Sequence, residues 1–210
     1  MNLTSASFGD GAAIPGRCAF AVIDPKTHVS LSDNRNPELS WSGAPAGTKS
    51  FVLFCIDHDC PTDGTDVNKE GRSVSKSLRR GEFMHWAMVD IPPSLTHIPE
   101  GFCSQGVTAR GKQKPKGPAG SRQGGNDYTG WFAADKDMAG TYLGYDGPCP
   151  PWNDELIHNY RFEVHALDLA RCPVGESFTV ADVRAAIAGH VLASATLTGL
   201  YTLNPAVKLP

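Results

Sequence analysis

Two uninterrupted apolar runs constrain the fold of this chain most strongly. Residues 50–56 read Ser-Phe-Val-Leu-Phe-Cys-Ile, and residues 84–91 read Met-His-Trp-Ala-Met-Val-Asp-Ile. Both runs are apolar and β-rich, so each predicts a strand that is covered on both faces. The first run stops at Asp57, and the second ends before Pro92 and Pro93, which cannot continue a strand ladder.

A third segment, residues 160–167, alternates instead of running continuously apolar. This alternation predicts a half-buried strand. One face carries Tyr160, Phe162, Val164 and Ala166, and the other carries Arg161, Glu163 and His165. Further strands are predicted at residues 18–23 and 195–203, and Gly199 weakens the latter.

Helices are few in this sequence. Thr179 and Asp182 form the start of a helix near the C-terminus, and Val183, Ile187 and Val191 follow as an apolar stripe. The 22 glycines and 16 prolines argue for many turns and against a helical bundle. We therefore predict a mainly β fold, an antiparallel β-sandwich of Greek-key-like connectivity with a few peripheral helices, in one domain that spans residues 1–210.

Residues 104–143 differ from the rest and predict a long loop insertion. Basic side chains stand there among glycines and prolines, which indicates a surface loop; a flap that contacts an anion or a protein partner is the alternative. Residues 106–112 imitate a phosphate-binding P-loop. Gln113 replaces the Ser or Thr that would hold magnesium, and Pro115 and Pro118 prevent the helix that should follow. Nucleotide hydrolysis is therefore excluded.

Charge and cysteine usage narrow the function classes further. With 19 basic and 22 acidic residues, the net charge of −3 offers no field for nucleic acid or an anionic membrane. Six cysteines without a C-x-x-C pair predict reduced, mostly buried thiols, with Cys55 in the core, although the even count leaves disulfides open. The N-terminus shows no signal-peptide pattern and no run is long enough to cross a membrane, so we expect a cytoplasmic protein.

Polar residues cluster where the predicted buried strands begin or end. Asp57 and Asp59 follow the first strand, His85 lies early in the second, and His158 and Tyr160 open the alternating one. If these strands are neighbours, a carboxylate, two imidazoles and a phenol converge at one end of the sheet. Imidazoles gain charge near pH 6–7, and nearby glycines expose backbone donors, so a small anion such as phosphate fits. Two ordinary core histidines are the alternative.

These clusters together resemble the phosphatidylethanolamine-binding protein family, also called Raf kinase inhibitor-like proteins, in its bacterial and archaeal branch. The resemblance extends from about Leu3 to Tyr201. The motifs that carry it lie at residues 36–41, 45–50, 57–61, 84–86, 147–151, 158–160 and 189–193.

The resemblance implies a β-sandwich with a shallow pocket for phosphate-like anions, including phospholipid head groups. The ligand-binding positions carried over are Asp57, Asp59, His85, Pro148, His158 and Tyr160. By resemblance we expect both histidines to donate to the anion, Asp57 to orient an imidazole or meet a cationic head group, and Tyr160 to form part of the wall.

This chain departs from the family pattern at several of these positions. His58 replaces a proline and Asn159 replaces an arginine, which removes a positive charge beside the site. Acidic Asp154 and Glu155 stand where a glycine-rich rim is more usual. The head-group preference of relatives therefore does not transfer directly.

We predict a non-catalytic binding protein with a regulatory role, such as inhibition of a kinase or protease, and with no cofactor, no metal and no nucleic-acid partner. No Gly-x-Ser-x-Gly elbow occurs. One alternative is a metal-binding protein or metal-dependent hydrolase. Its ligands would come from Asp57, His58, Asp59, Cys60, His85 and His158. Another is a scaffold that binds partners through residues 104–143, and a homodimer has no clear signature.

Overall fold

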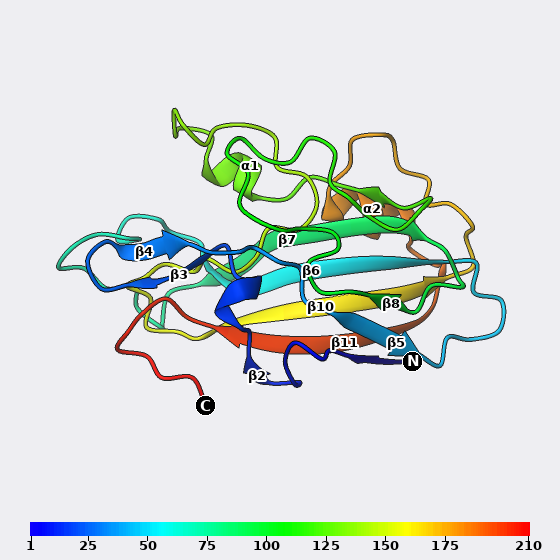
Figure 1. The fold of residues 1–210 in the computed structure, drawn as a ribbon, viewed down its shortest axis with the longest axis horizontal. Coiled ribbons are helices and arrows are strands. Elements are labelled where there is room, and N and C mark those ends of the chain that lie inside the picture. Colours follow the sequence, from blue (N-terminus) through cyan, green and yellow to red (C-terminus); the bar gives the residue numbers. More distant parts are fainter.

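A computed structural model describes residues 1–210, and a six-stranded sheet forms its centre (Figure 1). The strand order in this sheet is β2-β11-β10-β6-β7-β9. Its members are β2 (Ala12–Ala13), β6 (Ser50–Pro61), β7 (Arg80–Ile91), β9 (Arg122–Gln123), β10 (His158–Leu167) and β11 (Val191–Tyr201).

Two smaller sheets and three short helices complete the fold. One sheet has the order β1-β5-β8, and the other is a two-stranded hairpin. The strands of the first are β1 (Asn2–Thr4), β5 (Leu39–Ser42) and β8 (His97–Ile98), and those of the hairpin are β3 (Ala21–Asp24) and β4 (His28–Leu31). The helices are the 3-10 helix η1 (Gly16–Cys18), α1 (Tyr128–Trp131) and α2 (Val180–Ala186).

Strand β6 is covered on both faces, as its continuous apolar run predicts. Phe51, Leu53 and Cys55 belong to a cluster of 27 buried residues that includes side chains of β5 and β8. Val52, Phe54 and Ile56 belong to a second cluster, which includes Val180, Val183 and Ile187 from the α2 region. The large sheet is therefore the middle layer, with the small sheet on one side and α2 on the other.

The alternation predicted for β10 is confirmed. Tyr160, Phe162 and Val164 are fully buried, whereas Arg161 is exposed and Glu163 is partly exposed. On the inner face, Tyr160 and Phe162 belong to the buried cluster that also contains Trp41 of β5. The ring of Tyr160 therefore lies in the interior, whereas the adjacent Asn159 and Arg161 are exposed.

The predicted C-terminal helix is also confirmed, but it is shorter than the stripe suggested. Thr179 and Asp182 form a complete capping box at its start. The helix ends at Ala186, and Gly189 then adopts a positive φ of 82° before β11 begins. Val191 consequently lies in a strand, so its place in a helical stripe is wrong.

The sandwich prediction is confirmed only in its coarse form. The chain is mainly β with few helices, but the large sheet is not antiparallel throughout, because β2 pairs in parallel with β11. Two alanines are enough for this pairing, and nothing in their sequence indicated a strand. The Greek-key connectivity stays a prediction.

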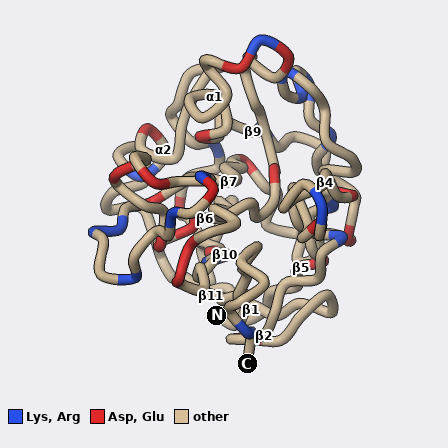
Figure 2. Tube along the Cα trace, turned by 90° about the vertical axis from the view of Figure 1, so that its left-hand side faces the viewer, with Lys and Arg blue, Asp and Glu red and all other residues tan.

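The 104–143 insertion packs onto the body and contains β9 and α1. Lys112 lies 2.5 Å from the buried carboxylate of Asp146, and Arg122 lies 2.6 Å from that of Asp90. Tyr128 is buried, as the aromatic content downstream of the basic stretch indicates. Figure 2 marks Lys and Arg positions and Asp and Glu positions at several separate places along the backbone.

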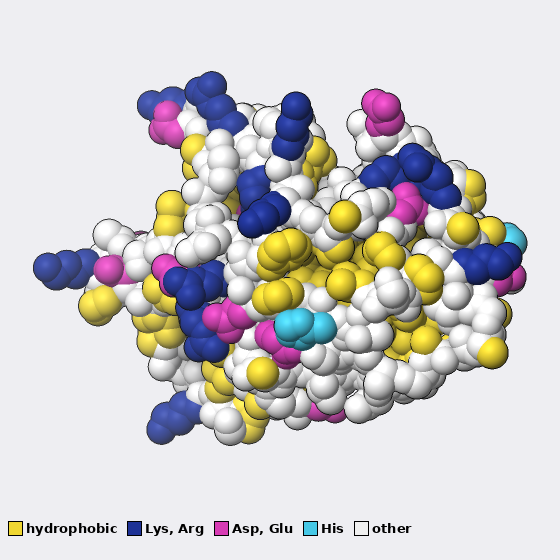
Figure 3. All heavy atoms as spheres, turned by 45° about the vertical axis from the view of Figure 1, so that its right-hand side comes forward, with side chains coloured by type: hydrophobic (Ala, Val, Ile, Leu, Met, Phe, Trp, Pro, Cys, Tyr) yellow, Lys and Arg dark blue, Asp and Glu magenta, His cyan; other side chains and the backbone are white.

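Apolar side chains are not confined to the interior. They gather in the middle of the face in Figure 3, where the surface is hollowed, with basic side chains above and to both sides and acidic and His side chains at the lower left. All six cysteines are free, and four of them are buried, as predicted. No helix has both the length and the apolar character that a membrane crossing requires.

Candidate functional site

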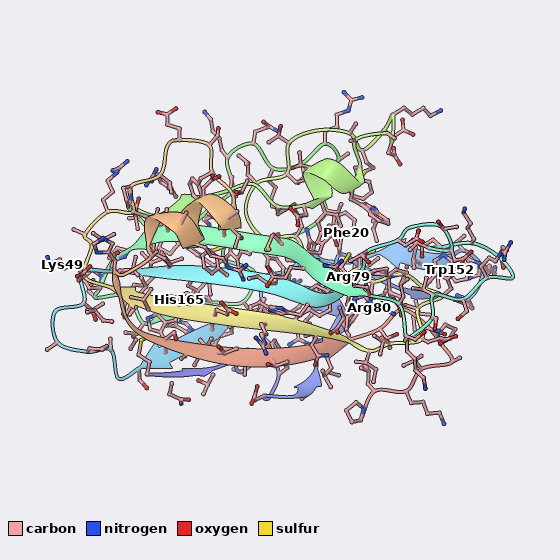
Figure 4. The ribbon with its side chains drawn as sticks, turned by 180° about the vertical axis from the view of Figure 1, so that it is seen from behind. Phe20, Lys49, Arg79, Arg80, Trp152 and His165 are labelled. Carbon is pink, nitrogen blue, oxygen red and sulfur yellow. The ribbon has the colours of Figure 1, made fainter.

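A cavity of about 230 Å³ lies at the end of the large sheet where β6 finishes and β7 and β10 begin. The strand register creates it, because Asp57 of β6 lies opposite Tyr160 of β10 on one side and Phe83 of β7 on the other. The three polar clusters of the sequence therefore do meet. Figure 4 shows Arg80, the first residue of β7, at this end of the sheet.

Most of the cavity wall is apolar. Phe83, Tyr128, Trp131 and Tyr160 supply aromatic rings, and Pro61, Pro150 and Pro151 supply stiff aliphatic surface. Trp131 is half-exposed and the other three aromatic residues are more deeply buried. The polar lining comes from Asp57, His85, His158 and two thiols, those of Cys60 and Cys149.

His158 is enclosed between two carboxylates. Its Nδ1 lies 2.7 Å from Oδ2 of Asp57, and its Nε2 lies 3.1 Å from Oδ2 of Asp154. Burial alone would lower the pKa of His158, but the two carboxylates outweigh burial and raise this pKa to about 9. His158 is therefore an imidazolium at neutral pH with both N–H groups engaged, and it has none free for a ligand.

Arg80 completes this charge network from the far side. Its guanidinium donates to both carboxylate oxygens of Asp154, at 2.5 and 3.0 Å. Burial raises the pKa of Asp154, yet the hydrogen bonds from His158 and Arg80 prevail and the pKa lies below its usual value. Two carboxylates thus balance one imidazolium and one guanidinium, so the network leaves no net charge beside the cavity.

His85 has the opposite environment, although it lies in the same wall. Its Nδ1 is 2.8 Å from the backbone carbonyl of Asp146, to which it donates, and its Nε2 has no protein partner. Burial outweighs the distant carboxylates and places the pKa of His85 below its ordinary value. At neutral pH its Nε2 is therefore a lone-pair acceptor.

The position of His85 depends on a third buried carboxylate, that of Asp146. Asp146 is 1% exposed and accepts hydrogen bonds from Asn34, Lys112 and Asn126. These contacts fix the position of the Asp146 backbone carbonyl, which accepts the hydrogen bond from Nδ1 of His85. Residues 104–143 thus support the site through Lys112 and Asn126, a role that their basic composition alone did not indicate.

Tyr160 brings an unsatisfied hydroxyl group to the cavity. Its side chain is fully buried, and its Oη has no hydrogen-bond partner. The ring of Tyr160 meets that of His85 edge-on, with centroids 5.1 Å apart. An unpaired buried hydroxyl destabilises the free protein, so a ligand that pairs with it gains a hydrogen bond at little cost.

Four of the six predicted binding residues line the cavity, and two do not. Asp57, His85, His158 and Tyr160 do so. The carboxylate of Asp59 instead accepts hydrogen bonds from the backbone and side chain of Asn159. Pro148 is buried behind the wall, where its carbonyl accepts from the backbone of Phe20.

The expectation that both histidines donate to an anion needs correction. His158 lacks a free N–H because Asp154, which lies between the proline-rich rim and β10, occupies its Nε2. Asp154 and Arg80 were missing from the predicted site. The departure of residues 154–155 from the family pattern was the one signal in the sequence, but it did not indicate that Asp154 contacts His158.

The metal-site alternative finds no support in the donor geometry. No three His, Cys, Asp or Glu side chains are arranged to hold a metal ion. The ring nitrogens of His158 are occupied by carboxylates, and Nδ1 of His58 lies 3.4 Å from Glu82. The candidate metal ligands thus contact other protein groups and do not converge on one point.

Comparisons with known proteins agree with the fold and the motifs. The family model described as phosphatidylethanolamine-binding protein matches residues 4–202. The UPF0098 protein YbhB of Escherichia coli K12 is 32% identical over 202 residues, covering 96% of this chain and 100% of its own length. An archaeal UPF0098 protein from Methanothermobacter thermautotrophicus is also 32% identical, over 96% of this chain and 98% of its own.

Solved structures give the same result. The crystal structure of E. coli YbcL, described as a new member of the mammalian PEBP family, has a TM-score of 0.68 and 28% identity, covering 96% of this chain and 97% of that one. A phosphatidylethanolamine-binding protein homolog from Chlamydia trachomatis has a TM-score of 0.64 and 25% identity, covering 95% of each chain. The chain therefore belongs to the phosphatidylethanolamine-binding protein family, in its bacterial and archaeal branch.

Proposed function

We propose that the cavity binds a small phosphoryl anion, such as a phosphate monoester head group, and that the protein acts by binding without catalysis. The observation that carries this proposal is the pair of unpartnered polar groups in one wall, Nε2 of His85 and Oη of Tyr160. Their rings are in contact, so one phosphoryl group can reach both.

The ligand binds together with one proton. Neutral His85 accepts from the P–OH of a monoanionic phosphoryl group, while Tyr160 donates to another oxygen of that group. If the ligand arrives as a dianion, His85 must instead be protonated. In both cases the complex contains one proton more than neutral His85 and the dianion. The balanced network of Asp57, His158, Asp154 and Arg80 neither attracts nor repels the anion strongly.

The remainder of the cavity suits an organic substituent on the phosphoryl group. The aromatic and proline surfaces extend to the half-exposed Trp131. The two thiols there favour binding over covalent catalysis, because burial raises the pKa of both Cys60 and Cys149 to about 12. A protonated thiol is a poor nucleophile.

Calorimetry with O-phosphoethanolamine tests this function. The second pKa of a phosphate monoester is about 6, so we expect the strongest binding at pH 5.5 and about tenfold weaker binding per pH unit above pH 6.5. His85→Gln should abolish the heat of binding. His97→Gln is the matched control, because His97 is half-exposed on β8, where it pairs with Glu38.

Two results would contradict the proposal. One is the absence of heat from the native protein at millimolar ligand and pH 5.5. The other is an affinity that does not change between pH 5.5 and pH 8, since that would remove the proton from the binding step. Circular dichroism of each variant separates loss of binding from loss of folding.

The regulatory role and the compartment belong to the same proposal. A protein partner such as a kinase or protease would contact the rim that includes Trp131, and the bound anion would alter that contact. A reducing compartment such as the cytoplasm suits six free cysteines, two of them partly exposed. Affinity purification with Trp131→Ala as the control tests the partner, and cell fractionation tests the location.

A further inference from the structure

The segment at residues 106–112, which imitates a P-loop, packs tightly against a later part of the insertion. Gly111 has a φ of 80°, and a Cβ atom at this position would lie only 2.2 Å from the backbone oxygen of Thr141. Glycine is therefore required at this contact. The next residue, Lys112, reaches inward, and its Nζ lies 2.5 Å from the carboxylate of Asp146.

Burial distinguishes this ion pair from the neighbouring lysine. The side chains of Lys112 and Asp146 are 13% and 1% exposed, whereas Lys114 is exposed. The amides of Asn34 and Asn126 donate the other hydrogen bonds to the carboxylate, but they carry no charge. Lys112 is therefore the cation that balances Asp146.

The residue that carries this carboxylate also holds His85 in place. The backbone N–H of Asp146 donates to the carbonyl of His85 at 3.2 Å, and its backbone carbonyl accepts from Nδ1 of His85 at 2.8 Å. Burial lowers the pKa of His85, and the Asp146 carboxylate is one of the charges that oppose this effect. The positive charge of Lys112 therefore limits the field of Asp146 at the imidazole.

The other charged groups near His85 are paired or open to solvent. Asp57 of β6 is bonded to protonated His158, and Asp127, which precedes α1, is exposed. The rings that contact the imidazole are uncharged at neutral pH, since burial raises the pKa of the two tyrosines among them: Phe83, Tyr128 and Tyr160. Loss of Lys112 would thus leave one unbalanced buried carboxylate beside His85.

We propose that Lys112 is a positioning residue of the anion site and acts by cancelling the charge of Asp146, a role that rests on the proposed function of the cavity. With the ion pair intact, His85 stays neutral in the free protein and no net negative charge lies behind the cavity wall. Without the lysine, the carboxylate would favour a proton on His85 and would repel a phosphoryl anion. The insertion thus adjusts the charge of a cavity that has no Lys or Arg in its lining.

Nuclear magnetic resonance titration of His85 in the free protein tests this role. Lys112→Met should raise the pKa of His85, and Asp146→Asn should lower it. The double variant should return the pKa close to the native value, because both charges are then absent. Lys114→Met removes the same charge from an exposed position two residues away and should leave the pKa unchanged. A merely structural contact would give shifts in the same direction for the two single variants, since both break it.

Calorimetry with O-phosphoethanolamine at pH 6.5 gives the second readout. Affinity should fall about tenfold in Lys112→Met, the order expected for one unbalanced charge in a partly buried site. It should recover in the double variant and should not change in Lys114→Met. Because the titration needs no ligand, the two experiments fail separately. Opposite pKa shifts in a native protein that binds no phosphate monoester would refute the proposed function but not the charge balance.

An unpaired buried carboxylate could prevent Lys112→Met from folding. Asp146→Asn and the double variant then give the same test, because the pKa of His85 should rise from the first to the second as the lysine charge is removed. The proposal is overturned if removal of that charge leaves the pKa of His85 unchanged, or if the two single variants shift it in the same direction.

Discussion

His85 and His158 line one cavity and are equally buried, at 2% and 1% exposure, yet the structure gives them opposite charge states. His85 faces a backbone carbonyl on one side and the cavity on the other, so burial keeps it neutral. His158 faces carboxylates on both sides, so it stays protonated. The difference shows that partner chemistry, rather than burial or sequence motif, decides what each imidazole offers a ligand.

Removing the carboxylate that distinguishes the two histidines should have the largest effect. Asp154→Asn leaves the charges of Arg80 and His158 without their shared partner in a buried position. We expect a loss of about 3–5 kcal/mol in the free energy of unfolding at pH 7, measured by urea denaturation. The neighbour variant, Glu155→Gln, should lose far less, because the Glu155 carboxylate is exposed to solvent. Equal losses in the two variants would contradict the account of the charge network.

The pH dependence of stability should separate the histidines next. The folded-state pKa of His158 is raised, so its contribution is complete below the unfolded pKa of about 6.5 and is lost as the pH rises through about 9. Relative to His158→Gln, the native protein should therefore lose on the order of 3 kcal/mol between pH 6 and pH 10. A parallel pair of stability curves across this window would show that His158 is not held protonated.

His85 should act in the reverse direction at acid pH. Because its folded pKa is depressed, its contribution is complete above about pH 6.5 and is lost as the pH falls through the folded value. Bound phosphate monoester should reverse this behaviour, since the complex of His85 with the phosphoryl group holds one extra proton. Thermal unfolding with and without O-phosphoethanolamine at pH 5.5 measures the change. If the ligand does not change the loss of stability at acid pH, the ligand binds away from His85.

Substitution of Tyr160, whose ring lies near both histidines, should change stability least. Tyr160→Phe removes a hydroxyl group that has no partner in the free protein, so stability should stay the same or rise by up to about 1 kcal/mol. Phosphate monoester affinity at pH 5.5 should nevertheless fall about tenfold, because one hydrogen bond to the anion is lost. A destabilised variant with unchanged affinity would mean that the hydroxyl serves the fold and not the ligand.

The sequence predicted the parts of this arrangement that follow from regular strands. The apolar run of β6 and the alternation of β10 placed Asp57, His85, His158 and Tyr160 at one end of a sheet, and the structure brings these residues to one cavity. The capping box at Thr179 likewise located α2. Periodicity and capping are local signals, so they survive in a single sequence.

The parts that were missed depend on irregular chain paths. Asp154 lies in the segment between the proline-rich rim and β10, where no periodicity tells which way a side chain turns. Arg80 reaches it from the beginning of β7, 74 residues away in sequence. The same limitation explains why Asp59 was assigned to the cavity, although it bonds to Asn159, and why the parallel β2 was not predicted.

A direct titration of the two imidazoles by nuclear magnetic resonance tests the central claim. We predict that His158 carries two ring protons at pH 7 and titrates with a pKa of about 9. His85 should be neutral at pH 7, with its proton on Nδ1 and its pKa below the ordinary value. A His158 that loses its proton below pH 7, or a His85 with the higher pKa of the two, would contradict this prediction.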